Sequence, residues 1–324
     1  MGLLPVKEIS RRSQVLKAPD FGCLKGVPAV NVTRGCLHRC VYCYARSFPE
    51  TPQGEVHLYA DLPERLAKEI ASRQRRGRLP AVVTFSTASD LFQPHPRLLK
   101  TTYRALKLLL ERGVTVSFLT KGRIPQDFWD LFRAHPGLVK ARFGLVSLSP
   151  AYHRLFEPLT ASAFLRLRQM EKALELGLEP TVRIDPVIPG VTDGEEQIES
   201  LLRHLAAIGL KEVSVSYLVL RPGVKRKLQQ ELPAGLLRDL LAAYRGMPWT
   251  KVITSATTKL ARREKRERGY RLFREIGRAY GLSVRICGCK NPDLPFEDCS
   301  PWNVTPRGPR QGELFGEIKM GGRS

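Results

Sequence analysis

The chain has no long apolar run. No stretch of about 18 or more apolar residues, the length that a membrane helix needs, occurs in it, and no charged start leads into an apolar segment of the signal-peptide type. These two absences predict a cytoplasmic protein with no membrane partner. Apolar residues still make up 43% and charged residues 26% of the 324 residues, which is typical of a globular protein with one large core or two smaller ones.

Acidic residues are scarce. Asp and Glu together number 31 against 53 Lys and Arg, which gives a formal net charge of +22. A charge of this size produces a positive potential over part of the surface, so we expect an anionic partner. Nucleic acid fits first, because each neutralised phosphate releases a counterion and adds salt-sensitive affinity. The alternatives are a solubility device or a thermophile's surface, and an acidic reductant of the flavodoxin or ferredoxin type would also be attracted.

Cysteine is absent between residues 44 and 286. An odd number of cysteines in a chain with no export signal argues against a disulfide framework and for metal or redox chemistry. The seven cysteines are Cys23, Cys36, Cys40, Cys43, Cys287, Cys289 and Cys299.

The first cysteine group lies in the stretch RGCLHRCVYCYAR, residues 34–46, with the spacing C-x3-C-x2-C. Thiolates are soft ligands that select zinc, copper(I) or iron-sulfur clusters. Structural zinc prefers four ligands, and this loop adds only His38 to its three cysteines. A four-iron cluster held by three cysteines leaves one iron open for a substrate or cofactor. Buried structural thiols are the alternative.

The middle of the chain alternates between strand-like and helical patterns. The strand-like runs are rich in Val, Leu and Ile, as buried parallel strands are. They occupy residues 27–33, 81–87, 114–120, 141–149, 180–188 and 212–220. Six such βα units predict an α/β fold, either a partial (β/α)6 barrel or a doubly wound flat sheet. Both place active sites at the carboxyl ends of the strands, and the cysteine loop follows the first strand.

The pattern divides the chain into four parts. We expect an N-terminal segment at residues 1–26, the partial barrel at 27–245, a C-terminal extension with a basic helix (256–280) and the second cysteine motif at 246–300, and a flexible basic tail at 301–324. The first half of the basic helix is either a solvated face or a phosphate-tracking surface. The clusters at 75–78 and 225–227 are further candidate phosphate contacts.

The cysteine loop resembles the signature of the radical S-adenosylmethionine (radical SAM) superfamily, with an aromatic residue before the last cysteine and a first strand before the loop. The resemblance implies a radical SAM type of partial barrel in which Cys36, Cys40 and Cys43 bind a 4Fe-4S cluster. The open iron would chelate S-adenosylmethionine. Reductive cleavage would then give a 5'-deoxyadenosyl radical that abstracts hydrogen from a substrate.

Within that superfamily, the sequence over about residues 27–225 is similar to the spore photoproduct lyases and the DNA repair photolyase-like proteins. The runs VYCYAR, STASDLFQP, FLTKG and EPTVRIDPVIPGVTD carry this likeness. It implies a radical relay through Tyr42 and Tyr44, and a lysine that meets the methionine carboxylate at Lys121. The further cofactor-binding residues that it implies are Ser89, Asp90, Ser147, Ser149, Arg183 and Asp185. For Arg183 and Asp185 a structural ion pair is the alternative.

The chain departs from the spore photoproduct lyases at Thr87. Those enzymes carry a cysteine there, two positions before the serine, which returns hydrogen to the product radical. Thr87 cannot serve this role, because its O–H bond is too strong. Reversal of a thymine photoproduct by that route therefore requires another donor.

The second cysteine group, Cys287, Cys289 and Cys299, has the spacing C-x-C-x9-C. An auxiliary iron-sulfur cluster is favoured, with Cys23 or a non-protein ligand in fourth place, since C-x-C is poorly shaped for a disulfide. A zinc site and redox-active thiols, including a replacement hydrogen donor, are the alternatives. In the tail, Gln311, Leu314 and Phe315 resemble the peptide by which bacterial proteins dock on the replication sliding clamp; chance occurrence is the other interpretation.

The sequence thus predicts a radical SAM enzyme that acts on nucleic acid, with DNA photolesion repair first. RNA modification, such as tRNA methylthiolation with an auxiliary cluster, is the second hypothesis and peptide modification the third. From a different class, a non-catalytic nucleic-acid-binding protein with structural zinc would be colourless and zinc-loaded.

Overall fold

The computed structural model describes residues 2, 4–20, 22–252 and 256–294. Its main feature is a curved sheet of seven strands, all parallel to their neighbours. In order across the sheet they are β12 (Ser283–Ile286), β9 (Glu212–Tyr217), β8 (Thr181–Val187), β7 (Val139–Gly144), β6 (Thr115–Thr120), β5 (Val82–Phe85) and β2 (Ala29–Val30).

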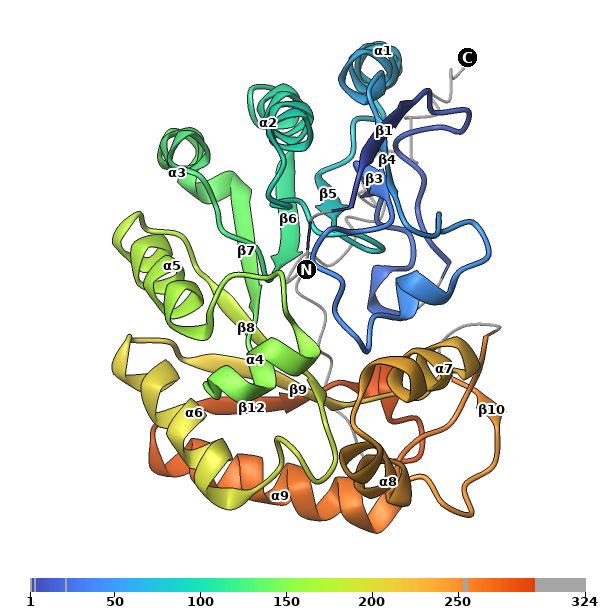
Figure 1. Cartoon of the computed structure of the whole chain (residues 1–324). Helices are drawn as coiled ribbons and strands as arrows, with labels where there is room; N and C mark the ends of the chain where they lie inside the picture. The colour runs from blue at the N-terminus through green and yellow to red at the C-terminus, as the bar shows by residue number, and fades with distance from the viewer. Residues whose placement is uncertain (1, 3, 21, 253–255, 295–324) are drawn as a thin grey trace, which may run out of the picture.

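The order of the strands decides between the two predicted architectures. From β2 to β12 the sheet follows the order of the chain without a reversal, whereas a doubly wound sheet reverses at a switch point. Six helices form an arc on the outer face of the sheet (Figure 1). They are α1 (Leu62–Arg75), α2 (Pro96–Leu110), α3 (Gln126–Arg133), α5 (Ala163–Glu175), α6 (Glu195–Ala207) and α9 (Arg263–Ala279). The α/β partial barrel expected from the sequence is therefore confirmed.

The strands lie where the apolar runs predicted them. Val83 of β5 pairs with Val116 of β6, and both side chains are fully buried. Gly177 ends a helix with φ +70°, a left-handed conformation that favours glycine. The chain then turns back into β8, so each helix packs against the strands beside it.

The cysteine loop is held by a second, smaller sheet. The predicted first strand stays in the main sheet only for Ala29–Val30 and then leaves it as β3 (Thr33–Arg34). β3 pairs antiparallel with β4 (Val56–Tyr59), and β4 pairs parallel with β1 (Val6–Ile9). The loop therefore runs from this small sheet to the short 3-10 helix η2 (Tyr44–Ser47).

The segment after residue 245 differs from its sequence-based description in two ways. The predicted helix 256–280 begins only at Arg263, because Thr257–Thr258 form β11, which pairs with β10 (Thr250–Lys251). The strand that follows α9 is the seventh strand of the main sheet, parallel to β9. The predicted boundary at residue 245 remains a prediction.

Three more helices complete the described part of the chain: α4 (Pro150–Phe156), α7 (Pro222–Glu231) and α8 (Ala234–Ala242). Among the described residues, no helix combines the length and the apolar character that crossing a membrane requires. The predicted tail with Gln311, Leu314 and Phe315 lies outside the described residues, and so does Cys299.

Candidate functional site

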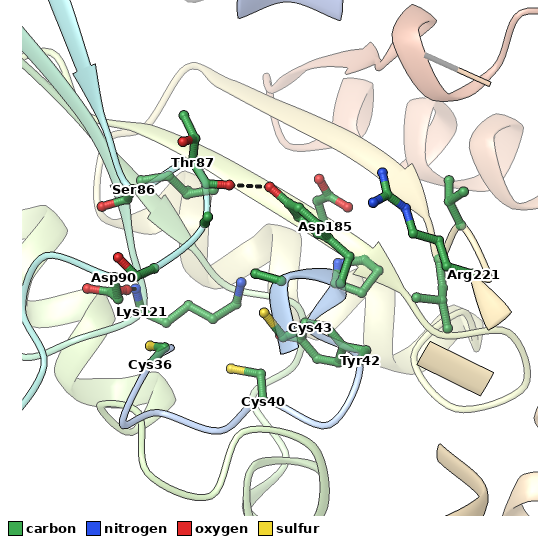
Figure 2. Close-up of a pocket in the computed structure, with 18 of the residues that line it drawn as sticks. Cys36, Cys40, Tyr42, Cys43, Ser86, Thr87, Asp90, Lys121, Asp185 and Arg221 are labelled. Atoms are coloured by element: carbon green, nitrogen blue, oxygen red, sulfur yellow. Dashed lines mark hydrogen bonds between the residues drawn. The ribbon is translucent and has the colours of Figure 1, made fainter. Parts of the chain in front are cut away.

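A cavity of about 510 Å³ lies at the carboxyl ends of the strands. It brings together residues that the sequence separates widely, from the cysteine loop, from the loops after β5 and β6, and from β8. Most of the predicted site residues line it: Cys36, Cys40, Tyr42, Cys43, Tyr44, Thr87, Ser89, Asp90, Lys121 and Asp185. Figure 2 shows the three cysteine side chains around a common space, with the Lys121 side chain extended beside them.

Three of the predicted cofactor-binding residues are not in the lining. Ser149 caps the start of α4, where its hydroxyl accepts a hydrogen bond from the amide of Tyr152 (3.3 Å). The hydroxyl of Ser147 accepts a bond from the amide of Ser149 (3.1 Å). Arg183 donates to Asp185 (2.7 Å). These contacts are structural, and a cofactor-binding role for the three side chains stays a prediction.

The cysteine loop is fixed by contacts of its backbone. The amide of Leu37 donates to the buried side chain of Gln93 (2.7 Å), and the amide of Val41 donates to the carbonyl of Phe156 (3.0 Å). The guanidinium of Arg46 donates to the carbonyl of Cys40 (3.3 Å). The thiols are therefore presented from a loop whose shape is set by its surroundings.

The three thiols of the cysteine loop suit an iron-sulfur cluster, which takes one thiolate at each of several irons. Burial raises the pKa of the Cys40 and Cys43 thiols, so a positively charged group has to replace their protons. Three thiols around one cavity fit this requirement.

Asp90 lines the cavity and holds the backbone around it through its carboxylate. Its carboxylate accepts hydrogen bonds from the Thr120 hydroxyl (2.8 Å), the Lys121 amide (2.8 Å) and the Phe92 amide (2.9 Å). Burial alone would raise the pKa of Asp90, but His38, 3.5 Å away, and these bonds lower it to about 2. The ionised carboxylate thus joins the loop after β5 to the end of β6.

Lys121 enters the cavity across a glycine. A Cβ atom at Gly144, the last residue of β7, would lie 2.8 Å from the Lys121 Nζ and 2.9 Å from its Cε. The ammonium lies 5.6 Å from the centre of the Tyr42 ring. Lys121 is therefore placed to offer positive charge beside the cysteines.

Tyr42 is part of a buried polar network beneath the cysteine loop. Its side chain is 7% exposed, and its hydroxyl donates to Glu157. Arg166 pairs with the other oxygen of Glu157 (2.5 Å) and also donates to the carbonyl of Gly144 (2.7 Å). No sequence motif indicated this network, because Glu157 and Arg166 meet only in the fold.

Tyr44 also lines the cavity and contacts Thr87, the residue that stands in place of the lyases' hydrogen-donating cysteine. Its hydroxyl donates to the backbone carbonyl of Thr87. The guanidinium of Arg221 lies 4.9 Å from the centre of the Tyr44 ring. The Thr87 hydroxyl accepts a hydrogen bond from the Asn31 side chain (2.7 Å). The Tyr44 phenol, with the Arg221 guanidinium beside its ring, therefore lies next to Thr87, which has no thiol.

Asp185 receives a partner that the sequence analysis missed. Lys290, from the 3-10 helix η4 (Gly288–Lys290) after β12, donates to both oxygens of Asp185 (2.6 and 2.8 Å). Burial alone would raise the pKa of Asp185, but Lys290 and Arg183 lower it. The C-terminal cysteine motif therefore contributes to the wall of the main cavity.

A second hollow of about 360 Å³ lies beside the cavity. Phe48 lines both, and Arg226 and Lys227 of α7 supply positive charge to the hollow. Arg46, also in its wall, pairs with Glu231 through both oxygens (2.6 and 3.0 Å). The site therefore continues as a basic surface outside the cysteine cavity.

The second cysteine group is only partly described. Cys287 is buried directly after β12, and Cys289 follows in η4. The amide of Cys23 donates to the sulfur of Cys289 (3.2 Å). Cys299 lies outside the described residues. Cys23 and Cys289, one from each end of the chain, are therefore neighbours.

Comparison with known proteins supports the family assignment made from the cysteine loop. The model of the radical SAM superfamily matches residues 30–205. The uncharacterized protein Rv2578c of Mycobacterium tuberculosis is 28% identical over 221 residues, covering 66% of this chain and 65% of that protein. A radical SAM Nalpha-GlyT isomerase of Pseudomonas phage M6 is 23% identical over 185 residues, covering 56% and 37%. The chain thus spans less than two thirds of the length of these relatives.

Among solved structures, a spore photoproduct lyase with bound AdoMet and dinucleoside spore photoproduct superimposes with a TM-score of 0.68. The match covers 86% of this chain and 81% of that one at 20% identity. At this identity the likeness shows that the two chains share a fold.

Proposed function

The chain belongs to the radical SAM superfamily, and from this premise we propose that it is an enzyme that forms a radical on a nucleic acid, with DNA photolesions as the first candidate substrate. One observation carries the proposal: the cavity lined by the three loop cysteines and Lys121 lies beside a basic hollow on α7, and Phe48 lines both.

The residues divide the work of holding a cofactor. Cys36, Cys40 and Cys43 would bind a 4Fe-4S cluster, and the Lys121 ammonium would meet the methionine carboxylate of S-adenosylmethionine. When bound, these two groups supply the 5'-deoxyadenosyl radical that abstracts hydrogen from the substrate. Asp90 positions the Lys121 backbone through the bond to its amide. The cavity walls exclude water that would compete for the same space.

The shape and charge of the site support a nucleotide as substrate. A cavity of about 510 Å³ lies within the range of about 300–1,000 Å³ that holds small ligands. Chemistry on a base requires that the nucleotide leave the helical stack. Arg226 and Lys227 lie in the adjoining hollow, where they would contact neighbouring phosphates. Phe48 and Tyr44, in edge contact with ring centres 5.5 Å apart, offer an aromatic surface to a base.

Thr87 favours a second candidate, a radical rearrangement rather than lesion reversal. The Thr87 hydroxyl is held by Asn31 and cannot return a hydrogen atom to a product radical. The phage relative is named an isomerase. In a rearrangement, the hydrogen atom can be returned by the 5'-deoxyadenosine formed in the first step, and no thiol is needed. The nucleotide product distinguishes the two candidates: repaired thymines after reversal, a rearranged isomer otherwise.

The test measures 5'-deoxyadenosine after anaerobic reconstitution and reduction. S-adenosylmethionine is supplied alone, then with irradiated DNA, unirradiated DNA, tRNA or a mixed peptide. We expect DNA to stimulate 5'-deoxyadenosine formation, with repaired thymines as the product of reversal or a nucleotide isomer as the product of rearrangement. Cys40→Ala is the control and should give no 5'-deoxyadenosine. Stimulation by tRNA or peptide but not by DNA would contradict the proposal.

A further inference from the structure

We propose that Cys23, Cys287 and Cys289 hold a second iron-sulfur cluster, where the segment before β2 contacts the segment after β12. The proposal concerns residues outside the first cysteine loop and does not rest on the identity of the substrate. The observations that carry it are the position of these cysteines in the topology, the contact between Cys23 and Cys289, and the rigid support of the turn that contains Cys287 and Cys289.

The two edge strands of the main sheet are β2 and β12. Cys23 lies in the 3-10 helix η1 (Gly22–Leu24), shortly before β2, and Cys289 lies in η4, directly after β12. The amide of Cys23 donates to the Cys289 sulfur (3.2 Å), although the two residues are 266 positions apart in the sequence. The contact therefore links the segments that adjoin the opposite edges of the sheet, where no strand pairing joins β2 to β12.

The turn with Cys287 and Cys289 is built as a fixed platform. The amide of Cys287 continues the strand pairing by donating to the carbonyl of Val215 (3.1 Å). The Asn291 side chain donates to the Cys287 carbonyl (2.8 Å). Arg266, 1% exposed, donates to Asn291 (2.8 Å) and pairs with Asp293 (2.5 Å). A buried guanidinium on the last long helix thus fixes the residues that follow the cysteines.

The donor chemistry selects the ligand. An amide that donates to sulfur stabilises the thiolate, and such bonds tune iron-sulfur clusters. Zinc sites use cysteine pairs separated by two to four residues and converge on one ion. Here only Gly288 separates Cys287 from Cys289. A cluster, with one thiolate on each of several irons, fits this set better than zinc.

The position of Lys290 gives the second site a connection to the main cavity. Lys290 follows Cys289 directly, lines the cavity and donates to Asp185 (2.6 Å). The turn that would carry the second cluster is therefore tied to the wall of the first site through Lys290.

The experiment isolates the second site by removing the first. A Cys36→Ala/Cys40→Ala/Cys43→Ala variant is reconstituted anaerobically, and iron and acid-labile sulfide per chain are measured. We expect about four irons in this variant and about eight in the wild type, the sum for two 4Fe-4S clusters. Adding Cys289→Ala or, separately, Cys23→Ala should reduce the iron of the triple variant at least about fourfold. Lys290→Ala, which alters the same turn without removing a thiol, is the matched control and should keep its iron.

Two results would overturn the proposal. One is a folded triple variant, with the wild-type circular dichroism spectrum, that contains no iron. The other is zinc in place of iron after purification and reconstitution. Cys23 lies apart from the platform of β12, so Cys23→Ala keeps the test valid if Cys289→Ala fails to fold. The second cluster and the proposed substrate can fail separately. Loss of iron on adding Cys289→Ala or Cys23→Ala to the triple variant would support the second cluster, even if no nucleic acid stimulates 5'-deoxyadenosine formation by the wild type.

Discussion

Lys121 reaches the cavity because residue 144 has no side chain. In Gly144→Ala the new methyl group would lie less than 3 Å from three atoms of the Lys121 side chain, so the ammonium must move. We expect the dissociation constant for S-adenosylmethionine to rise about tenfold, which corresponds to about 1.4 kcal/mol. Equilibrium binding to the reconstituted protein measures this.

The matched control is Gly137→Ala, before the other end of β7, where a Cβ meets no atom within 4 Å. It should bind S-adenosylmethionine as the wild type does. Equal affinity in Gly144→Ala and the wild type would show that Lys121 does not contact the cofactor.

A thiol at position 87 tests what the missing cysteine means. Thr87→Cys places an S–H group in the cavity lining, at the residue whose backbone carbonyl accepts the Tyr44 hydrogen bond, and a thiol there can return a hydrogen atom to a product radical. If lesion reversal is the reaction, the yield of repaired thymine per 5'-deoxyadenosine should increase several-fold. Thr87→Ser, which keeps a hydroxyl, is the control. Quantifying both products by mass spectrometry gives the ratio, and an unchanged ratio in Thr87→Cys would favour rearrangement.

The buried pair of Glu157 and Arg166 makes stability depend on pH in a defined direction. Burial alone would raise the pKa of Glu157, but Arg166 keeps it below its usual value. The stabilisation is therefore complete above a pH of about 4.3, the unfolded pKa, and is lost as the pH falls through the lower folded pKa.

In Arg166→Met the sign reverses, because burial then raises the pKa of Glu157 above its unfolded value. The variant should be about 3–5 kcal/mol less stable at neutral pH and should lose further stability as the pH rises. Urea unfolding at pH 5 and pH 8 measures both effects. Arg168→Met, an exposed arginine on the same helix, should change little. A stability of Arg166→Met that increases with pH would contradict this account.

At the residue scale, the sequence predicted which residues face the cavity but few of their partners. The cysteines, Lys121 and Asp90 follow strands at motif positions, so their place at one edge of the sheet could be anticipated. Lys290 could not, because its approach to Asp185 depends on a strand pairing that joins residues about 70 positions apart. Tyr42 was expected in a radical relay; its burial on Glu157 shows a supporting contact that motifs do not encode.

At the element scale, α9 packs closely against the sheet at Gly269. A Cβ at Gly269 would lie 1.8 Å from the Tyr217 hydroxyl oxygen, and Tyr217 is buried in β9. Gly269→Ala should therefore destabilise the fold by about 1–3 kcal/mol through overpacking, although alanine favours helix by about 1 kcal/mol.

Gly235→Ala in α8 has open space around its Cβ and is the matched control. Thermal or urea unfolding should show a loss for Gly269→Ala and no loss for Gly235→Ala. Equal stability of the two variants would mean that α9 can shift away from β9 without cost.

At the element scale, apolar runs gave the strands because parallel strands buried on both faces read as continuous hydrophobic stretches. The basic character of α9 misled in one respect. Its first half was expected to be a solvated face or a phosphate-tracking surface, but Arg266 there is fully buried against Asp293. Charge alone does not show which arginine of a helix meets a carboxylate from another element.

At the scale of the whole molecule, part of the net charge of +22 lies next to the cavity. Arg226 and Lys227 lie in the hollow beside the cavity. The cluster at residues 75–78 lies between α1 and β5, at the amino ends of the strands and so on the edge opposite the cavity. Of these two basic groups, only Arg226 and Lys227 are placed to contact the proposed nucleic-acid substrate.

Duplex DNA affinity should therefore fall steeply with salt, by about 0.9 in the logarithmic slope for each phosphate contact. Arg226→Gln/Lys227→Gln should reduce that slope by up to about 1.8, and Arg75→Gln/Arg76→Gln, with the same charge change, should reduce it less. Fluorescence anisotropy at several salt concentrations measures both. Equal slopes in the two double variants would indicate nonspecific attraction to the whole surface.

The ion pair between Arg46 and Glu231 also has a thermodynamic consequence. Arg46 donates to the carbonyl of Cys40 in the cysteine loop and to Glu231 at the end of α7, the helix that carries Arg226 and Lys227. Arg46 therefore contacts both the hollow and the cysteine loop. A ligand bound in the hollow should alter the affinity of the loop for the cofactor, and the cofactor should alter the affinity of the hollow by the same factor. Such reciprocity would bias cofactor binding toward molecules that already hold a substrate and limit cleavage in its absence.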